Sequence, residues 1–243
     1  MKEGLYLFCF FITSNAVFSQ ITSKELKDKA INYSYLKNYK KAIECYSEIV
    51  KINPKDSTAY IERALLKQLT LDYKGAISDF TEGGKINPNE VDYFFLRGML
   101  RQKMKDYKNA ILDYNKTMTM EVNADAYRFR GQIKEVYKDY KGAMLDYDKA
   151  ISITKYSEIY IDRGKLKNKL KDLKGAIEDL NTALIIDPLD ENAYFSKAEI
   201  LIKNKDYKNA LIDINKAIEL NKDCNKYYLK KALIESKLSR TKK

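Results

Sequence analysis

Apolar side chains recur along this chain at helical spacing, in pairs of stretches separated by short polar joints. In one such pair, Tyr60 and Ala64 share one helical face, and Ala76 and Phe80 share the face of the next stretch. Asp72 lies at the joint, where its carboxylate can accept backbone N–H bonds from a new first turn. The pattern therefore predicts a hairpin of two helices.

The same hairpin pattern occurs six times. A phrase of the type Tyr-Lys-x-Ala opens each second helix, with Leu173 replacing the tyrosine once. Its alanines step by 34, 34, 33, 33 and 34 residues and are Ala42, Ala76, Ala110, Ala143, Ala176 and Ala210. Self-similarity at this period indicates a solenoid of stacked helical hairpins. We predict an all-α fold with repeats at 23–56, 57–90, 91–123, 124–156, 157–190 and 191–224.

These residues carry a family resemblance. The order of residue types in one unit resembles the tetratricopeptide repeat. That order is a bulky aromatic residue, a small residue four positions later, an alanine twelve positions beyond it, a second aromatic residue four positions further, and a closing proline, here Pro88. The resemblance covers residues 23–224 and implies a right-handed solenoid of helix-turn-helix units. The chain departs from the family in having tyrosine where tryptophan is usual, and in lacking the proline in its two 33-residue repeats.

Residues 225–243 follow the sixth repeat. Asn225 to Ser239 resembles a seventh first helix, with Tyr228 and Ala232 at the bulky and small positions. Proteins of this family often end with such a helix. We predict that it caps and solvates the last repeat and that a short tail follows.

The first nineteen residues differ from the rest. Lys2 precedes an apolar run from Leu5 to Ile12, and small residues follow as far as Ser19. This order is typical of a secretory signal, so we expect residues 1–19 to be removed and the protein to be exported, either periplasmic or secreted. The alternatives are cleavage after Ala16, or an apolar N-terminal helix that docks on the first repeat. No other segment approaches transmembrane length.

Composition limits the chemistry. The chain has 45 Lys and Arg against 34 Asp and Glu, a net charge of +11 that favours anionic partners. It has no histidine, no Gly-rich phosphate loop and no paired-cysteine metal motif. Cys45 and Cys224 lie five repeats apart, beyond disulfide reach. We therefore expect no enzyme activity, no cofactor, no metal and no nucleic acid partner.

A charged pair recurs with a spacing of sixteen residues. Its members are Arg63 and Asp79, Arg97 and Asp113, Arg130 and Asp146, Arg163 and Asp179, and Lys197 and Asp213. One interpretation makes them five ion or catalytic sites. The other makes them internal salt bridges that fix the register of each hairpin, and we favour it because architecture repeats in every unit whereas function seldom does.

A lysine also recurs in the first turn of each second helix. These residues, here called the lysine ladder, are Lys40, Lys74, Lys108, Lys141, Lys174 and Lys208. They could form a positive stripe for an anionic polymer or a lipid surface. They could equally form a solvated edge, because an aspartate lies two residues before five of them and offsets the charge.

The resemblance implies that the first helices line a concave binding face. The candidate ligand-binding residues on that face are Ile61, Leu65, Phe95, Met99, Lys103, Arg128, Lys165, Lys169, Phe195 and Lys203. They do not repeat, unlike the core, and apolar residues flanked by lysines suit an extended peptide with acidic or carboxylate features. Ordinary packing between repeats is the alternative role for some of them.

The sequence therefore predicts a non-enzymatic scaffold of the bacterial cell envelope that binds a protein or peptide. Two alternatives stay open: an electrostatic module that uses the lysine ladder, and a docking subunit of an enzyme complex. Some family members grip a chaperone's C-terminal carboxylates through lysine and asparagine. Here Lys27 matches that set, but Ile31 and Glu62 replace its asparagines, which argues against that activity.

Overall fold

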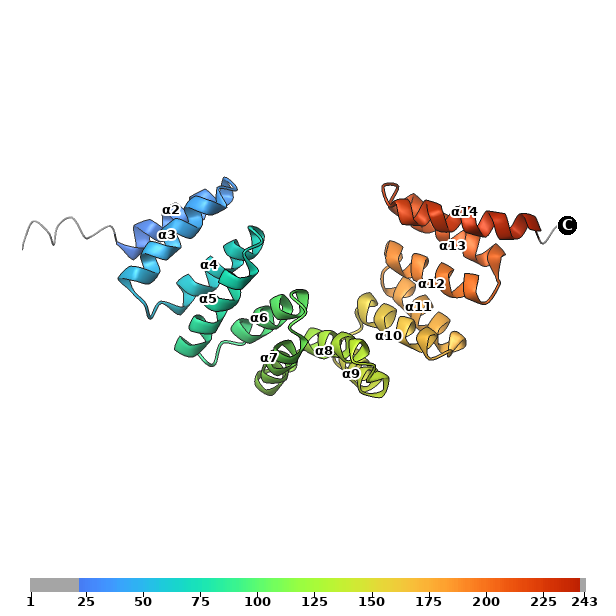
Figure 1. Ribbon diagram of the computed structural model, residues 1–243, viewed down its shortest axis with the longest axis horizontal. Coiled ribbons are helices and arrows are strands. Elements are labelled where there is room, and N and C mark those ends of the chain that lie inside the picture. Colours follow the sequence, from blue (N-terminus) through green and yellow to red (C-terminus); the bar gives the residue numbers. More distant parts are fainter. Residues whose placement is uncertain (1–21, 241–243) are drawn as a thin grey trace, which may run out of the picture. The chain divides into compact units, whose positions relative to one another are not determined.

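The computed structural model describes residues 22–240 (Figure 1). Within this range the chain forms thirteen helices, α2 to α14, and no strand. Its internal contacts divide it into two compact units, Met1–Met120 and Glu121–Lys243. The predicted all-α architecture of helical hairpins followed by a C-terminal helix is confirmed.

The first unit contains three hairpins. Its helices are α2 (Ser23–Tyr35), α3 (Tyr39–Ile52), α4 (Ser57–Leu69), α5 (Tyr73–Ile86), α6 (Asp92–Lys103) and α7 (Tyr107–Met120). Each first helix packs along its own second helix, and within this unit α3 contacts α4 and α5 contacts α6. The core therefore grows by stacking, as expected for a repeat protein.

The second unit contains three more hairpins and a final helix. Its helices are α8 (Ala124–Val136), α9 (Tyr140–Ile153), α10 (Ser157–Lys169), α11 (Leu173–Ile186), α12 (Glu191–Lys203), α13 (Tyr207–Leu220) and α14 (Asn225–Arg240). In this unit α10 also contacts the first helices on either side, α8 and α12. Their outer side chains therefore form one face.

The small residues mark the closest approaches between helices. The six alanines of the Tyr-Lys-x-Ala phrases are fully buried. At the small position of α6, a Cβ added to Gly98 would lie 2.9 Å from a ring carbon of Tyr114, so only glycine allows this approach. Large side chains, including Phe80, Tyr114 and Tyr147, fill the remaining space without exposure.

Every hairpin joint has the same backbone conformation, which the sequence pattern did not reveal. The residue before each capping position is left-handed, with φ from 57° to 69°, and it is Lys37, Leu71, Lys105, Lys138, Lys171 or Lys205. At one joint the Asp72 N–H donates back to the Lys67 carbonyl at 2.8 Å, which closes the first helix. The Asp72 carboxylate then accepts from the Gly75 N–H at 2.9 Å, as the cap prediction required.

Helix α14 keeps the register of the other first helices but is covered on one side only. Tyr227 and Ile234 are buried, as the equivalent Ala193 and Ile200 of α12 are, whereas Tyr228 and Ala232 are exposed. In the other repeats the bulky and small positions pack on the second helix of the same hairpin. No second helix follows α14 among residues 22–240, so α14 buries the side that faces α13.

The described helices give no candidate for a membrane span, because none is both long and apolar enough. The predicted signal segment, residues 1–19, lies outside the described residues.

Candidate functional site

The predicted charged pairs are salt bridges inside the hairpins. Arg63 donates from Nε to Asp79 Oδ2 at 2.9 Å and from Nη2 to Asp79 Oδ1 at 2.7 Å. The same fork-on-carboxylate geometry occurs at Arg163 and Asp179. The aspartates of all five pairs are buried. The architectural interpretation of these pairs is therefore confirmed.

Four of the five pairs also have a second cation that sequence reasoning missed. Lys67 lies 2.8 Å from Asp79, and Arg101 lies 2.6 Å from Asp113. Lys134 and Lys167 occupy the same position in the fourth and fifth repeats. The signal was present in the sequence, because a basic residue stands four positions after each arginine. With both oxygens bonded, these carboxylates are structural.

Three of the arginines also reach the preceding second helix. Arg63 donates to Ser47 Oγ at 3.2 Å, and Arg97 donates to Thr81 Oγ1 at 3.1 Å. Arg163 donates to Asp148 Oδ1 at 2.7 Å. One guanidinium thus bonds two successive hairpins.

The sixth repeat breaks this pattern. Lys197 lies 3.3 Å from Asp213 Oδ1, and Leu201 stands where the other repeats have their second cation. Asp213 Oδ2 is buried and has no hydrogen-bond partner. Burial raises the pKa of Asp213 above its ordinary value, because the attraction of Lys197 offsets the loss of water only in part.

In the first unit, the candidate binding residues lie on α4 and α6 at different depths. Ile61 and Leu65 are half-buried against a core cluster, and the ring centroid of Phe95 lies 6.2 Å from that of Tyr114. Met99 and Lys103 are exposed. The Lys103 ammonium lies 4.7 Å from the centroid of the Tyr73 ring, which tethers it to α5.

In the second unit, two of the candidates join neighbouring repeats. Arg128 of α8 donates from Nε to Asp162 of α10 at 2.7 Å. The ring centroid of Phe195 on α12 lies 4.9 Å from that of Tyr227 on α14. Packing between repeats, the role left open for some of these residues, therefore accounts for Arg128 and Phe195.

The remaining candidates of this unit are exposed lysines, Lys165 and Lys169 on α10 and Lys203 on α12. We call these three residues the basic face. The Lys169 ammonium lies 4.6 Å from the centroid of the Tyr140 ring and 3.8 Å from Glu135 Oε2. Burial raises the pKa of Glu135, and the charge of Lys169 acts against that shift. Lys169 is therefore held in place, whereas Lys165 and Lys203 point a charge at solvent.

The six residues of the lysine ladder are all exposed. Each is the second residue of its helix, and the capping side chain of Asp72, for example, lies two residues before Lys74. The offsetting aspartates are thus in place beside the ladder.

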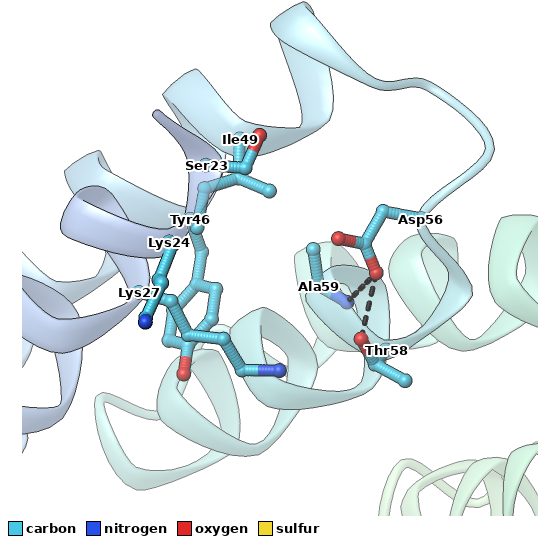
Figure 2. Close-up of a pocket in the computed structure, with 8 residues that line it drawn as sticks. All are labelled: Ser23, Lys24, Lys27, Tyr46, Ile49, Asp56, Thr58 and Ala59. Atoms are coloured by element: carbon cyan, nitrogen blue, oxygen red, sulfur yellow. Dashed lines mark hydrogen bonds between the residues drawn. The ribbon is translucent and has the colours of Figure 1, made fainter. Parts of the chain in front are cut away.

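A small cavity opens between α2, α3 and α4 (Figure 2). It has a volume of about 170 Å³, with buried Tyr46, Ile49 and Ala59 in its wall and exposed Lys27 at its edge. At the equivalent of Ala59, the next repeat has Tyr93, whose hydroxyl donates to the Ser57 carbonyl. Where the next repeat has the buried Tyr93 side chain, this repeat has only the methyl group of Ala59.

Comparison with known proteins supports the repeat assignment. A family model described as tetratricopeptide repeat matches residues 23–56, and a second model with the same description matches residues 91–121 and 191–224. The chain carries tetratricopeptide repeats. A search of curated proteins gives no match.

Solved structures share the fold at low sequence identity. A chain of the APC/C hetero-tetramer Cut9–Hcn1 is 15% identical with a TM-score of 0.71, and the alignment covers 93% of this chain and 45% of that one. A tetratricopeptide repeat protein from Parabacteroides merdae is 17% identical with a TM-score of 0.67, covering 89% and 86%. YrrB, described as a TPR protein with an unusual peptide-binding site, is 17% identical with a TM-score of 0.58, covering 78% and 99%.

These comparisons bear on function only coarsely. Tetratricopeptide repeats indicate a protein-binding scaffold, and no catalytic family is indicated. In the part of the chain that the structure describes, no cluster of acidic residues and cysteines could hold a metal ion. This chain spans less than half of the Cut9–Hcn1 chain that it resembles.

Proposed function

We propose that this tetratricopeptide repeat protein is a non-enzymatic scaffold of the bacterial cell envelope that binds a protein or an extended peptide through its first helices. The observation that carries the proposal is a contrast within each repeat. Core alanines and buried ion pairs recur from hairpin to hairpin, whereas the exposed residues of the first helices differ. Architecture explains the first set, and a specific ligand explains the second.

The charge of the basic face indicates the chemistry of the ligand. Lys165, Lys169 and Lys203 present ammonium groups on adjacent helices, and within residues 121–240 no carboxylate forms a salt bridge with Lys165 or Lys203. Ammonium groups in such a position attract acidic side chains or a terminal carboxylate. The net charge of +11 acts in the same direction.

Paired charge reversals test the proposal. Crosslinking in cells followed by mass spectrometry would identify a partner, and the purified partner would then be titrated. We expect Lys165→Glu with Lys203→Glu to weaken binding about tenfold or more, because each change replaces attraction by repulsion. The matched control is Lys174→Glu with Lys208→Glu, which makes the same change of charge on the lysine ladder of the same unit.

The two alternatives make opposite predictions in this experiment. If the ladder control abolishes binding and the face variant does not, the protein is an electrostatic module and the proposal is wrong. If the captured partner is a catalytic chain whose substrate also crosslinks, the protein is the docking subunit of an enzyme complex.

Export is part of the proposal and has its own test. The apolar run from Leu5 to Ile12 and the small residues after it support a cleaved signal. We expect the protein purified from its own cells to begin near Gln20, as N-terminal sequencing would show. Recovery of an intact Met1 from the cytosolic fraction would contradict export.

A further inference from the structure

The sixth hairpin contains a buried carboxylate that the rest of the fold does not satisfy. In the fifth repeat, Asp179 receives two bonds from the Arg163 guanidinium, at 2.9 and 2.7 Å, and a third from Lys167 at 2.8 Å. In the sixth, Lys197 alone approaches Asp213, which is 5% exposed. Asp213 Oδ2 has no donor, and burial of an unpaired carboxylate oxygen is costly.

Asp213 lines a cavity of about 330 Å³ between three helices. The other lining residues are Ile177 and Asn181 of α11, Lys197 and Leu201 of α12, and Asn209 and Ile212 of α13. Asn181, Asn209 and Ile212 are exposed, and Ile212 retains 65% of its accessible surface. The cavity is therefore open to solvent beside a buried acceptor.

The repeat register shows which groups are missing from this cavity. In the fifth repeat, the guanidinium of Arg163 bridges Asp179 and Asp148 on the preceding second helix. The position of Asp148 corresponds to Asn181 in the next repeat. Lys197 stands where the fifth repeat has Arg163, so the planar guanidinium is absent from the sixth repeat. Leu201 stands where the fifth repeat has Lys167, so the second cation is absent too. Asp213 and Asn181 stay as acceptors, and of the donors only the Lys197 ammonium remains, on Asp213 Oδ1.

We infer that this cavity binds the guanidinium group of an arginine from a partner protein. The group would donate to Asp213 Oδ2 and to the side-chain oxygen of Asn181, which reproduces the bridge that Arg163 makes one repeat earlier. Two cations on one carboxylate are already present in four hairpins of this protein. The residues of the basic face take no part, so this site goes beyond the proposed function.

The net charge of the chain does not oppose this contact at close range. Charges farther than about 8 Å are largely screened at physiological salt, whereas a guanidinium on a buried carboxylate makes charge-assisted hydrogen bonds. Arginine is favoured over lysine here because two separated acceptors match its fork.

A small-molecule probe tests the inference without knowledge of the partner. N-acetyl-arginine-N-methylamide would be titrated into the full chain and followed by amide NMR signals. We expect saturable shifts at Asn181, Asn209 and Asp213, and binding at least tenfold weaker for the citrulline analogue, which has the same shape without the charge. Absence of saturable shifts with the arginine probe would overturn the inference and assign Asp213 Oδ2 to a water molecule.

A second experiment places longer side chains of the protein itself in the cavity. The double variant Lys197→Arg with Leu201→Lys restores the residues of the fifth repeat, so it should melt at a higher temperature and lose the arginine probe. Leu201→Met is the matched control, because it keeps an uncharged side chain of similar volume and should bind as the parent does. Undiminished binding by the double variant would overturn the inference. If that variant folds poorly, Asp213→Asn provides the same readout, since it removes the charge and keeps the shape.

Discussion

Tyr227→Ala is expected to lower the free energy of unfolding by about 3–4 kcal/mol, whereas Tyr228→Ala is expected to change it by less than about 0.5 kcal/mol. Tyr227 is 1% exposed against the sixth hairpin, and the next residue, an identical side chain, is 45% exposed. Urea unfolding followed by circular dichroism gives both values. The pair is its own control, because composition and helix propensity are unchanged between the two variants.

Removal of the whole helix extends this expectation. Deletion of residues 225–243 uncovers the core cluster that contains Ile214 and Ala217 of α13. We expect the shortened protein to associate in solution, as light scattering would show, because an exposed apolar flank of a solenoid favours self-contact. Equal loss of stability from both tyrosine variants would mean that α14 does not cap the array through the side facing α13.

Gly83→Ala is expected to destabilise the protein by about 2–3 kcal/mol, although alanine normally favours a helix by about 1 kcal/mol. A Cβ at Gly83 would lie 2.2 Å from a ring carbon of Tyr93, so the buried ring would have to move. The neighbouring Gly84 is the matched control, since its added Cβ would meet Tyr93 at 3.4 Å. Gly84→Ala should therefore stabilise the protein slightly.

The Tyr93→Leu background gives the decisive comparison. With the ring absent, the cost of Gly83→Ala should disappear, which thermal unfolding of the four variants of this cycle would measure. A cost that persists without the ring would place its origin in the helix backbone and contradict the steric explanation.

The fold was largely predictable because the features that determine it repeat. The Tyr-Lys-x-Ala phrase located every second helix, and the sixteen-residue spacing located the five buried aspartates and one cation for each. The left-handed joints were not predictable, because lysine or leucine occupies them where glycine is the usual signal. The exposure of Tyr228 and Ala232 in α14 depended on a missing neighbour, which no residue within that helix records.

The candidate site was less predictable than the fold, for a physical reason. Position on a first helix indicates which side a residue faces, but not whether the next repeat covers it. Arg128 and Lys165 occupy comparable faces, yet Asp162 binds Arg128 and leaves Lys165 exposed. The missing partner of Asp213 Oδ2 is recognisable only by comparison with the other repeats, in which a second cation bonds the equivalent carboxylate.

The arginines that bond two hairpins give the array a direction. Each guanidinium reaches backward, from Arg63 to Ser47, from Arg97 to Thr81 and from Arg163 to Asp148. Its acceptor therefore belongs to a segment that leaves the ribosome first. During synthesis, which proceeds from the N-terminus, a newly emerged hairpin finds the earlier half of its bond already folded. The polarity of these contacts matches the order in which the chain is made.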